Sequence, residues 1–168
     1  PSGAKIRNVV STADLEAAMA EESKDADVII MAAAVADYRP ALVADSKMKK
    51  GTADDALSSL QLVENPDVLK GLVAQRAAGE LKEGVVIVGF AAETGDSTHT
   101  ALEFAQAKFE RKGCDVLMAN EVGEGKVFGQ TTSEGWILRR DSEPQVVAHG
   151  SKHVVAAQIL DAVNQILS

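Results

Sequence analysis

The sequence lacks several features that mark large classes of proteins. It has 1 cysteine and 4 prolines among 168 residues, which excludes a disulfide framework and a proline-rich disordered or collagen-like chain. Its longest apolar run, Val28–Ala36, is about half of the roughly 18 residues that a membrane-spanning helix needs. No apolar stretch of signal-peptide length follows the first residues either. We therefore expect a protein that does not associate with a membrane.

Positive charge is also in the minority. The 17 Lys and Arg residues face 25 Asp and Glu residues, which gives a formal net charge of −8 at pH 7. A general nucleic-acid binder spreads positive charge along phosphates, so this balance argues against nucleic acid as a partner.

Cys114 has no second cysteine with which to form an internal disulfide. A composition with a single cysteine is typical of proteins of the reducing cytoplasm. The position of Cys114 before an apolar run predicts that its thiol is packed in the core.

Three apolar runs predict buried strands. Residues 27–34, 84–90 and 115–119 are apolar on both faces, as strands inside a parallel sheet are. Each run follows a segment with helical spacing, and this alternation is typical of an α/β domain. The length of 168 residues and an apolar content of 46% suit a single globular domain.

Capping residues predict where the helices begin and end. The helices are expected from Ser11, from Asn65 to about Ala77, over residues 97–112 and over residues 151–167. Ser11 with Asp14 resembles a capping box, and Asn65-Pro66 resembles a cap followed by a proline at the first helical position. Basic residues before Gly113 indicate the end of the third helix.

The remaining segments complete the predicted fold. Residues 6–10 suggest a weak first strand, while residues 134–139 and 144–148 predict an antiparallel hairpin. We expect one domain over residues 1–168, a three-layer Rossmann-like or ribokinase-like α/β fold. Its mixed sheet is mostly parallel, with the antiparallel hairpin at its C-terminal side. The opening has no Gly-rich phosphate loop of the kind that usually follows the first strand in this architecture.

The stretch from Met31 to Pro40 is the first candidate for a binding site. Small residues at the carboxyl end of a buried parallel strand let a ligand approach the backbone, and Asp37 would lie at the mouth of such a site. The alternative is that the alanines serve helix packing and that Asp37 is a turn residue.

A lysine cluster, Lys47-Met48-Lys49-Lys50, is the second candidate. It falls in an expected loop from Tyr38 to about Ser58, and so long a loop in a compact domain is commonly a lid or disordered. Positive charge on a mobile lid suits a polyphosphate ligand. The alternative is a solvated run of charge.

Two further candidates come from the second half of the chain. Phe90 ends a buried run and offers a face on which a base can stack, although a core phenylalanine explains it equally well. Lys108 and Lys112 lie one helical turn apart, where they bind ligand oxygens or complement the helix dipole. His99, His149 and His153 do not combine with other residues into a zinc site.

Six motifs occur in a distinctive order. They are Ala-Ala-Val-Ala-Asp-Tyr-Arg-Pro ending at Pro40, Lys-x-Lys-Lys from Lys47, Asn65-Pro66-Asp67, Gly-Phe-Ala-Ala-Glu-Thr from Gly89, Lys108-x-x-x-Lys112, and Met-Ala-Asn-Glu from Met118. In this order they resemble the phosphopantothenate–cysteine ligase family, also called phosphopantothenoylcysteine synthetase, of coenzyme A biosynthesis. The resemblance covers nearly all of residues 9–168.

The resemblance implies a CTP-dependent amide ligation with Mg²⁺ present. The carboxylate of 4′-phosphopantothenate attacks the α-phosphate of CTP, pyrophosphate leaves, and the amine of cysteine displaces CMP from the acyl-cytidylate. Lys47 is implied as the catalytic residue that contacts the acyl-cytidylate and phosphates, and Asp37 as a ligand of the nucleotide or its metal. The other implied nucleotide contacts are Met31, Ala32, Ala33, Asn65, Pro66, Asp67, Val68, Phe90, Lys108 and Lys112.

The resemblance also implies an assembly. Family members form homodimers with active sites near the interface, and the strands after Asn120 are our candidate dimer element. Many members are fused to a flavin-dependent decarboxylase, and the family's opening Gly-Gly-Thr and Ser-Ser-Gly region has no counterpart here.

A catalytically incomplete nucleotide-binding or dimerisation fragment of the same fold is the principal alternative. A Rossmann-type dehydrogenase is a third, but no Gly-x-Gly-x-x-Gly follows an early strand.

Overall fold

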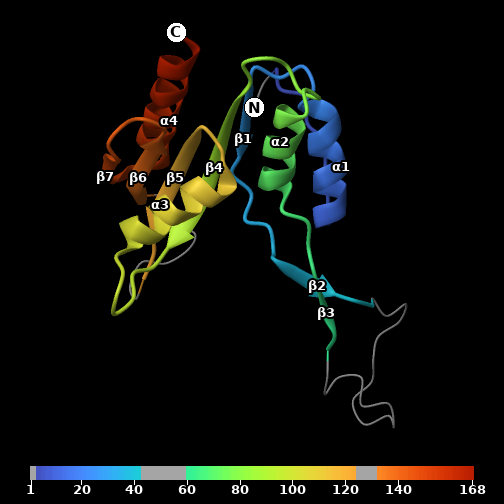
Figure 1. The fold of residues 1–168 in the computed structure, drawn as a ribbon, viewed down its shortest axis with the longest axis horizontal. Helices are drawn as coiled ribbons and strands as arrows, with labels where there is room; N and C mark the ends of the chain where they lie inside the picture. The colour runs from blue at the N-terminus through green and yellow to red at the C-terminus, as the bar shows by residue number, and fades with distance from the viewer. Residues whose placement is uncertain (1–2, 43–59, 124–131) are drawn as a thin grey trace.

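A five-stranded sheet forms the centre of the structure (Figure 1). The structure is a computed structural model that describes residues 3–42, 60–123 and 132–168. The strands of this sheet are β1 (Val28–Met31), β4 (Val86–Glu93), β5 (Val116–Glu121), β6 (Thr132–Arg139) and β7 (Gln145–Ser151). They lie in the order β1-β4-β5-β6-β7, with the first three parallel and the last two antiparallel to their neighbours. The predicted mixed sheet with its C-terminal hairpin is confirmed.

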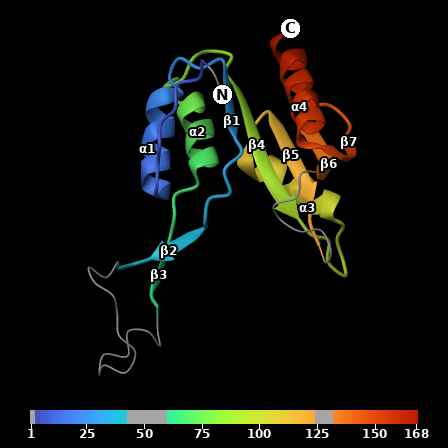
Figure 2. The same ribbon diagram turned by 180° about the vertical axis from the view of Figure 1, so that it is seen from behind.

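Helices lie on both faces of this sheet, which gives the predicted three layers (Figure 2). The helices are α1 (Thr12–Glu22), α2 (Val68–Ala77), α3 (Ala101–Lys112) and α4 (Lys152–Leu167). α2 and α3 cover one face, and α1 packs beside α2. α4 covers the other face. The helices in the described ranges are too short or too polar to span a bilayer.

Alternating side chains of the parallel strands build two separate cores. Ile87 and Leu117 are fully buried against α2 and α3, whereas Val88 and Met118 are fully buried against α4. Successive strand residues point to opposite faces, so a strand covered on both sides must be apolar throughout. This is why the apolar runs identified β4 and β5 correctly. The run at residues 27–34 predicted too long a strand, because β1 ends at Met31 and lies at the edge of the sheet, where Ile30 is 44% exposed.

Helix termini follow the predicted capping in part. The capping box of α1 is present, and α3 ends at Gly113, whose φ of 72° is the left-handed conformation that glycine adopts without strain. The predicted start of α3 at residue 97 is wrong. A capping box of Thr100 and Glu103 begins this helix at Ala101 instead, because it satisfies the free amides of the first turn.

The predicted cap of α2 is also wrong. Asp67 is the N-cap, and its carboxylate accepts a hydrogen bond from the Lys70 backbone N–H. Asn65, the expected cap, uses its side chain in tertiary contacts with Ala36 and Arg39 instead. Pro66 therefore precedes the helix rather than occupying its first turn.

A second, two-stranded sheet extends away from the central one (Figure 1). It consists of β2 (Tyr38–Pro40) and β3 (Leu62–Glu64), which pair antiparallel. The predicted loop from Tyr38 is therefore wrong for its first three residues, which form a strand because residues distant in sequence pair with them. The rest of that loop, from residue 43, lies outside the described residues, and so does the lysine cluster.

Residues 6–10 form no strand, contrary to the prediction. Val10 is 99% exposed and Ile6 is 70% exposed, so neither side chain is buried in a sheet. Arg7 of this segment instead forms an ion pair with Glu21 of α1, and the preceding Lys5 forms one with Glu22.

Cys114 is a packed thiol, as predicted. It is fully buried just before β5. Burial raises the pKa of the Cys114 thiol to about 11, so the thiol stays protonated and unreactive at neutral pH.

Candidate functional site

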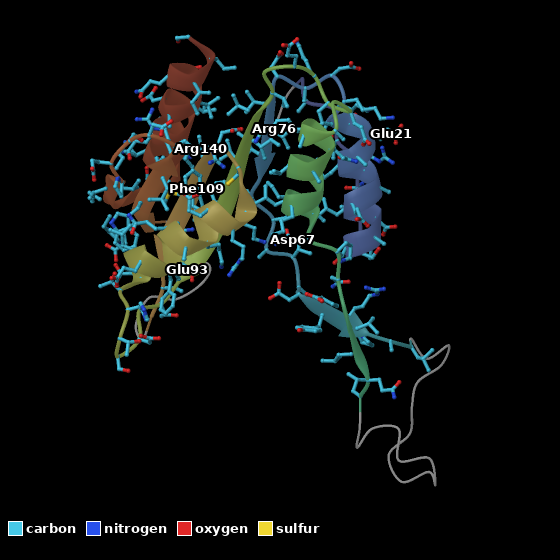
Figure 3. All side chains as sticks on the ribbon, in the orientation of Figure 1. Glu21, Asp67, Arg76, Glu93, Phe109 and Arg140 are labelled. Atoms are coloured by element: carbon cyan, nitrogen blue, oxygen red, sulfur yellow. The ribbon has the colours of Figure 1, made fainter. Side chains whose placement is uncertain are left out.

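The candidate site lies at the edge of the central sheet where the three parallel strands end. α2 and α3 each begin at this edge, because each helix precedes a parallel strand and runs in the opposite direction. Figure 3 shows Asp67 and Glu93 at this edge and Arg76 toward the other end of α2. Open α/β sheets bind ligands outside the carboxyl ends of their strands.

The connection between β1 and β2 exposes small residues at this edge. Met31, the last residue of β1, is 8% exposed, whereas Ala32 and Ala33 are exposed. The side chain of Asp37 is exposed as well. Methyl side chains on an exposed connection leave the backbone open to a ligand, as the sequence predicted for this stretch.

Asn65 holds this connection in place. Its Nδ2 donates a hydrogen bond of 2.8 Å to Ala36 O, and its backbone N–H donates one of 2.7 Å to Asp37 O. Its Oδ1 accepts a hydrogen bond of 3.0 Å from Arg39 Nη1, which also donates to Glu64 O at 2.9 Å. The structure thus brings together two predicted binding segments that lie about thirty residues apart in sequence.

Asp67 joins α2 to α3 through Lys112. Lys112 Nζ donates a hydrogen bond of 2.6 Å to Asp67 Oδ2. Burial by itself raises the pKa of the Asp67 carboxyl, but the hydrogen bonds from Lys112 and the Lys70 backbone hold this pKa below its ordinary value. Asp67 is therefore ionised at neutral pH, and the ammonium group of Lys112 is fixed beside the start of α2.

Lys108 forms a second ion pair at the same edge. Its Nζ contacts Oε1 of Glu93, the last residue of β4, and the side chains are 28% and 14% exposed, respectively. Lys108 lies one helical turn before Lys112, as the sequence predicted. Two ammonium groups are therefore present at the edge, and each has a carboxylate partner.

Phe90 lies on the other face of the sheet. It is partly buried and packs against the core beneath α4, so it points away from Lys108 and Lys112. The two proposals for Phe90, core residue and stacking platform, are compatible with this half-buried position. The structure does not bring Phe90 together with the lysines on one face.

A groove of about 430 Å³ opens beside the β1–β2 connection. One wall is the start of α1, with Ser11 and Thr12, and the other includes Arg39, Asn65 and Pro66. Hydroxyl groups, a guanidinium and an amide therefore line a cavity large enough for part of a small molecule. Val68, the remaining predicted residue of this segment, is buried in the core at the start of α2.

A magnesium ion has one candidate ligand among the predicted residues. The described part of the chain contains no cluster of three or more His, Cys, Asp or Glu side chains that suits a metal. Mg²⁺ bound with a nucleotide is commonly held by one or two carboxylates together with phosphate oxygens and water. The exposed carboxylate of Asp37 fits that more limited role.

Some parts of the site were not foreseen from the sequence. Glu93 belongs to a motif that was singled out, yet no role was given to its carboxylate. The contacts of Arg39 with Asn65 and Glu64 O depend on the pairing of β2 with β3. The predicted catalytic residue Lys47 lies outside the described residues, so its role stays a prediction.

Comparison with known families gives a match along nearly the whole chain. The family model described as "DNA/pantothenate metabolism flavoprotein C-terminal domain" matches residues 1–167. The coenzyme A biosynthesis bifunctional protein CoaBC of Mycolicibacterium smegmatis is 46% identical over 163 residues, which are 97% of this chain and 39% of that protein. The CoaBC of Bacillus subtilis is 36% identical over 165 residues, covering 97% of this chain and 37% of that protein. The chain thus spans about two fifths of the length of these relatives.

Solved structures agree with this match. The crystal structure of the C-terminal domain of a CoaBC bifunctional protein superposes with a TM-score of 0.63 at 28% identity, over 95% of this chain and 66% of that chain. The DNA/pantothenate metabolism flavoprotein from Streptococcus pneumoniae superposes with a TM-score of 0.67 at 20% identity, over 98% of this chain and 72% of that chain. The second likeness supports the fold alone.

Proposed function

Since this chain belongs to the DNA/pantothenate metabolism flavoprotein C-terminal domain family, we propose that it is the ligase domain of a coenzyme A biosynthesis protein. The proposed reaction joins 4′-phosphopantothenate to L-cysteine at the expense of CTP and releases CMP and pyrophosphate. Relatives that share 36–46% of its residues carry the name coenzyme A biosynthesis bifunctional protein, which supports this assignment.

One observation of the structure carries the proposal. Lys108 pairs with Glu93 at the end of β4, and Lys112 reaches from the last turn of α3 to Asp67 at the start of α2, while small residues leave the connection after β1 open. Fixed ammonium groups and exposed backbone are what a triphosphate needs, because phosphoryl transfer depends mainly on positioning and on neutralising charge. Each ammonium group is paired with a carboxylate in the structure, so the phosphates of CTP would replace Glu93 and Asp67 as its partners.

The proposed reaction has two steps. A carboxylate oxygen of 4′-phosphopantothenate attacks the α-phosphorus of CTP, an O–P bond forms, and pyrophosphate leaves. The amine of cysteine then attacks the acyl carbon, CMP leaves with the bonding electron pair, and the amine loses a proton. Activation is required because a free carboxylate does not react with an amine at neutral pH.

In this proposal, different residues contact different parts of CTP and its bound metal. Lys108 and Lys112 neutralise phosphate oxygens, and backbone groups from Met31 to Ala33 contact the nucleotide. Asn65 fixes the connection that carries Asp37. Asp37 would hold Mg²⁺, which supplies further neutralisation of phosphate charge when it is bound. Lys47 acts on the phosphoryl group that reacts.

The proposal also covers the setting of the enzyme. We place it in the cytoplasm, as a homodimer whose parent protein carries a flavin-dependent decarboxylase. The word bifunctional in the relatives' names supports a second activity in the parent protein. The strands after Asn120 stay the candidate dimer element.

The test combines turnover with binding. The protein is incubated with CTP, Mg²⁺, 4′-phosphopantothenate and cysteine, and we expect pyrophosphate and CMP in equal amounts together with the ligated thiol product. Lys112→Gln should weaken CTP binding about tenfold. Lys82→Gln is the matched control, because Lys82 pairs with Asp27 at the opposite edge of the sheet. Binding of CTP without turnover would favour the incomplete nucleotide-binding fragment, and no binding of CTP would overturn the proposal.

A further inference from the structure

Glu93 is the last residue of β4 and reaches the same edge as the lysines of α3. Its side chain is 14% exposed, and its Oε1 contacts Lys108 Nζ. In the parallel register Glu93 lies opposite Glu121, and its backbone O accepts a hydrogen bond of 2.9 Å from Val122 N. The position of the carboxylate is therefore set by two paired strands rather than by a free loop.

The two ion pairs of this edge differ in what their carboxylates do. Asp67 binds Lys112 and also caps α2, so its position is needed for the helix. The carboxylate of Glu93 caps no helix; its pair joins the end of β4 to the third turn of α3. Glu93 is thus free to exchange its partner without loss of a helix cap.

The location of the Lys108–Glu93 pair distinguishes it from two other ion pairs that join elements of the sheet and its helices. Arg76–Asp115 and Lys82–Asp27 join elements at the opposite, amino edge of the strands. Lys108–Glu93 lies at the edge where an open α/β sheet binds its ligand. Lys108 is only 28% exposed, and a partly desolvated ammonium group without a counter-charge is unfavourable.

We propose that Glu93 is the counter-ion of Lys108 in the free protein and that it competes with the phosphates of the nucleotide for this ammonium group. The inference rests on the proposed function, because it takes the nucleotide as the competing anion. The carboxylate keeps the ammonium group in place when the site is empty. It also competes with phosphate, so CTP must displace one carboxylate contact in order to bind Lys108.

The test measures CTP binding by calorimetry in variants that change only this pair. Glu93→Gln removes the competing charge, so we expect the Kd for CTP to fall about fivefold relative to the unaltered protein. Glu93→Asp withdraws the carboxylate by one methylene and should give an intermediate value, and it serves if Glu93→Gln does not fold. Glu93→Gln combined with Lys108→Met should lose the gain, because the ammonium group that benefits is gone.

A purely structural role predicts a different pattern. It would leave the Kd unchanged or raise it, and either result overturns the inference. Asp27→Asn is the control, since it removes an ion pair at the opposite edge and should not change the Kd. If the unaltered protein binds no CTP, both the proposed function and the inference fail. If it binds CTP and Glu93→Gln binds no more tightly, only the inference fails.

Discussion

Lys112, in the last turn of α3, donates a hydrogen bond of 2.6 Å to Asp67, and Asp67 is at the same time the N-cap of α2. One carboxylate therefore satisfies a free amide of one helix and fixes an ammonium group of another. Asp67 connects the stability of the fold to the geometry of the candidate site.

The two roles of Asp67 are separable by substitution. Asp67→Ala removes both the cap and the ion pair, and we expect it to lower the free energy of unfolding by about 1–2 kcal/mol. Asp67→Asn keeps a good capping side chain and loses only the charge, so the loss should stay below about 1 kcal/mol. Urea unfolding at pH 7 measures both values. Equal losses in the two variants would show that the cap contributes little.

Stability should decrease in acid. The pKa of Asp67 lies below its ordinary value, so its interactions stabilise the fold above that value, and the stabilisation is lost as the pH falls through the lowered pKa. Hydrogen bonds to the capping-box carboxyls of Asp14 and Glu103 lower their pKa values too. We expect the free energy of unfolding to fall as the pH drops below about 4. The drop should be shallower in Asp67→Asn, and an unchanged slope would contradict this assignment.

A half-buried ion pair at the amino edge should matter for stability alone. Asp115 Oδ2 accepts hydrogen bonds from Arg76 and from Ile87 N, and Arg76 also donates to Val85 O and Gly113 O at 3.2 Å each. Asp115→Asn leaves the guanidinium without its counter-charge, which should cost about 2–3 kcal/mol of stability.

The control for Asp115 is an exposed pair at the same edge. Asp27→Asn breaks the pair with Lys82, whose side chain is 49% exposed, and should cost less than about 1 kcal/mol. Chemical denaturation of both variants compares them directly. A loss in Asp115→Asn no larger than in Asp27→Asn would mean that the contacts of Arg76 contribute little to the fold.

Phe90→Ala separates core packing from base stacking. Because Phe90 packs partly against the core beneath α4, its removal should lower stability by about 2 kcal/mol. If Phe90 also stacks on the cytosine, the affinity for CTP should fall by a further 1–3 kcal/mol, about five- to 150-fold. Phe90→Leu keeps most of the packing and loses the stacking face. A folded Phe90→Ala protein with unchanged CTP affinity would make Phe90 a core residue only.

Lys47 is expected to act on charge that develops during phosphoryl transfer. Lys47→Gln should reduce ligation about 100-fold or more and weaken CTP binding less than turnover, since one charged donor to a developing anion is lost. Lys49→Gln and Lys50→Gln are matched controls in the same cluster. Full activity of Lys47→Gln with loss in a control would shift the role to that lysine, and full activity of all three would leave the cluster as solvated charge.

Local patterns in the sequence determined the core of the fold. Strands that are buried on both faces must be apolar throughout, so β4 and β5 were recognisable from residues 84–90 and 115–119 alone. The capping box of Ser11 and Asp14 and the glycine end of α3 were recognisable for a similar reason, since a cap involves residues only three or four positions apart. The spacing of Lys108 and Lys112 likewise fixed their common side of α3.

Only the tertiary structure decided which partner each polar group takes. Asn65 fails to cap α2 because Ala36 O and Arg39, brought to it by the pairing of β2 with β3, occupy its side chain. Glu93 meets Lys108 and Asp67 meets Lys112 only once α3 lies across the sheet beside α2. The sequence by itself identified which residues carry charge near the strand ends. It did not determine which charges neutralise one another, because hydrogen bonds and ion pairs act over a few ångströms between residues that are fifteen to forty-five positions apart.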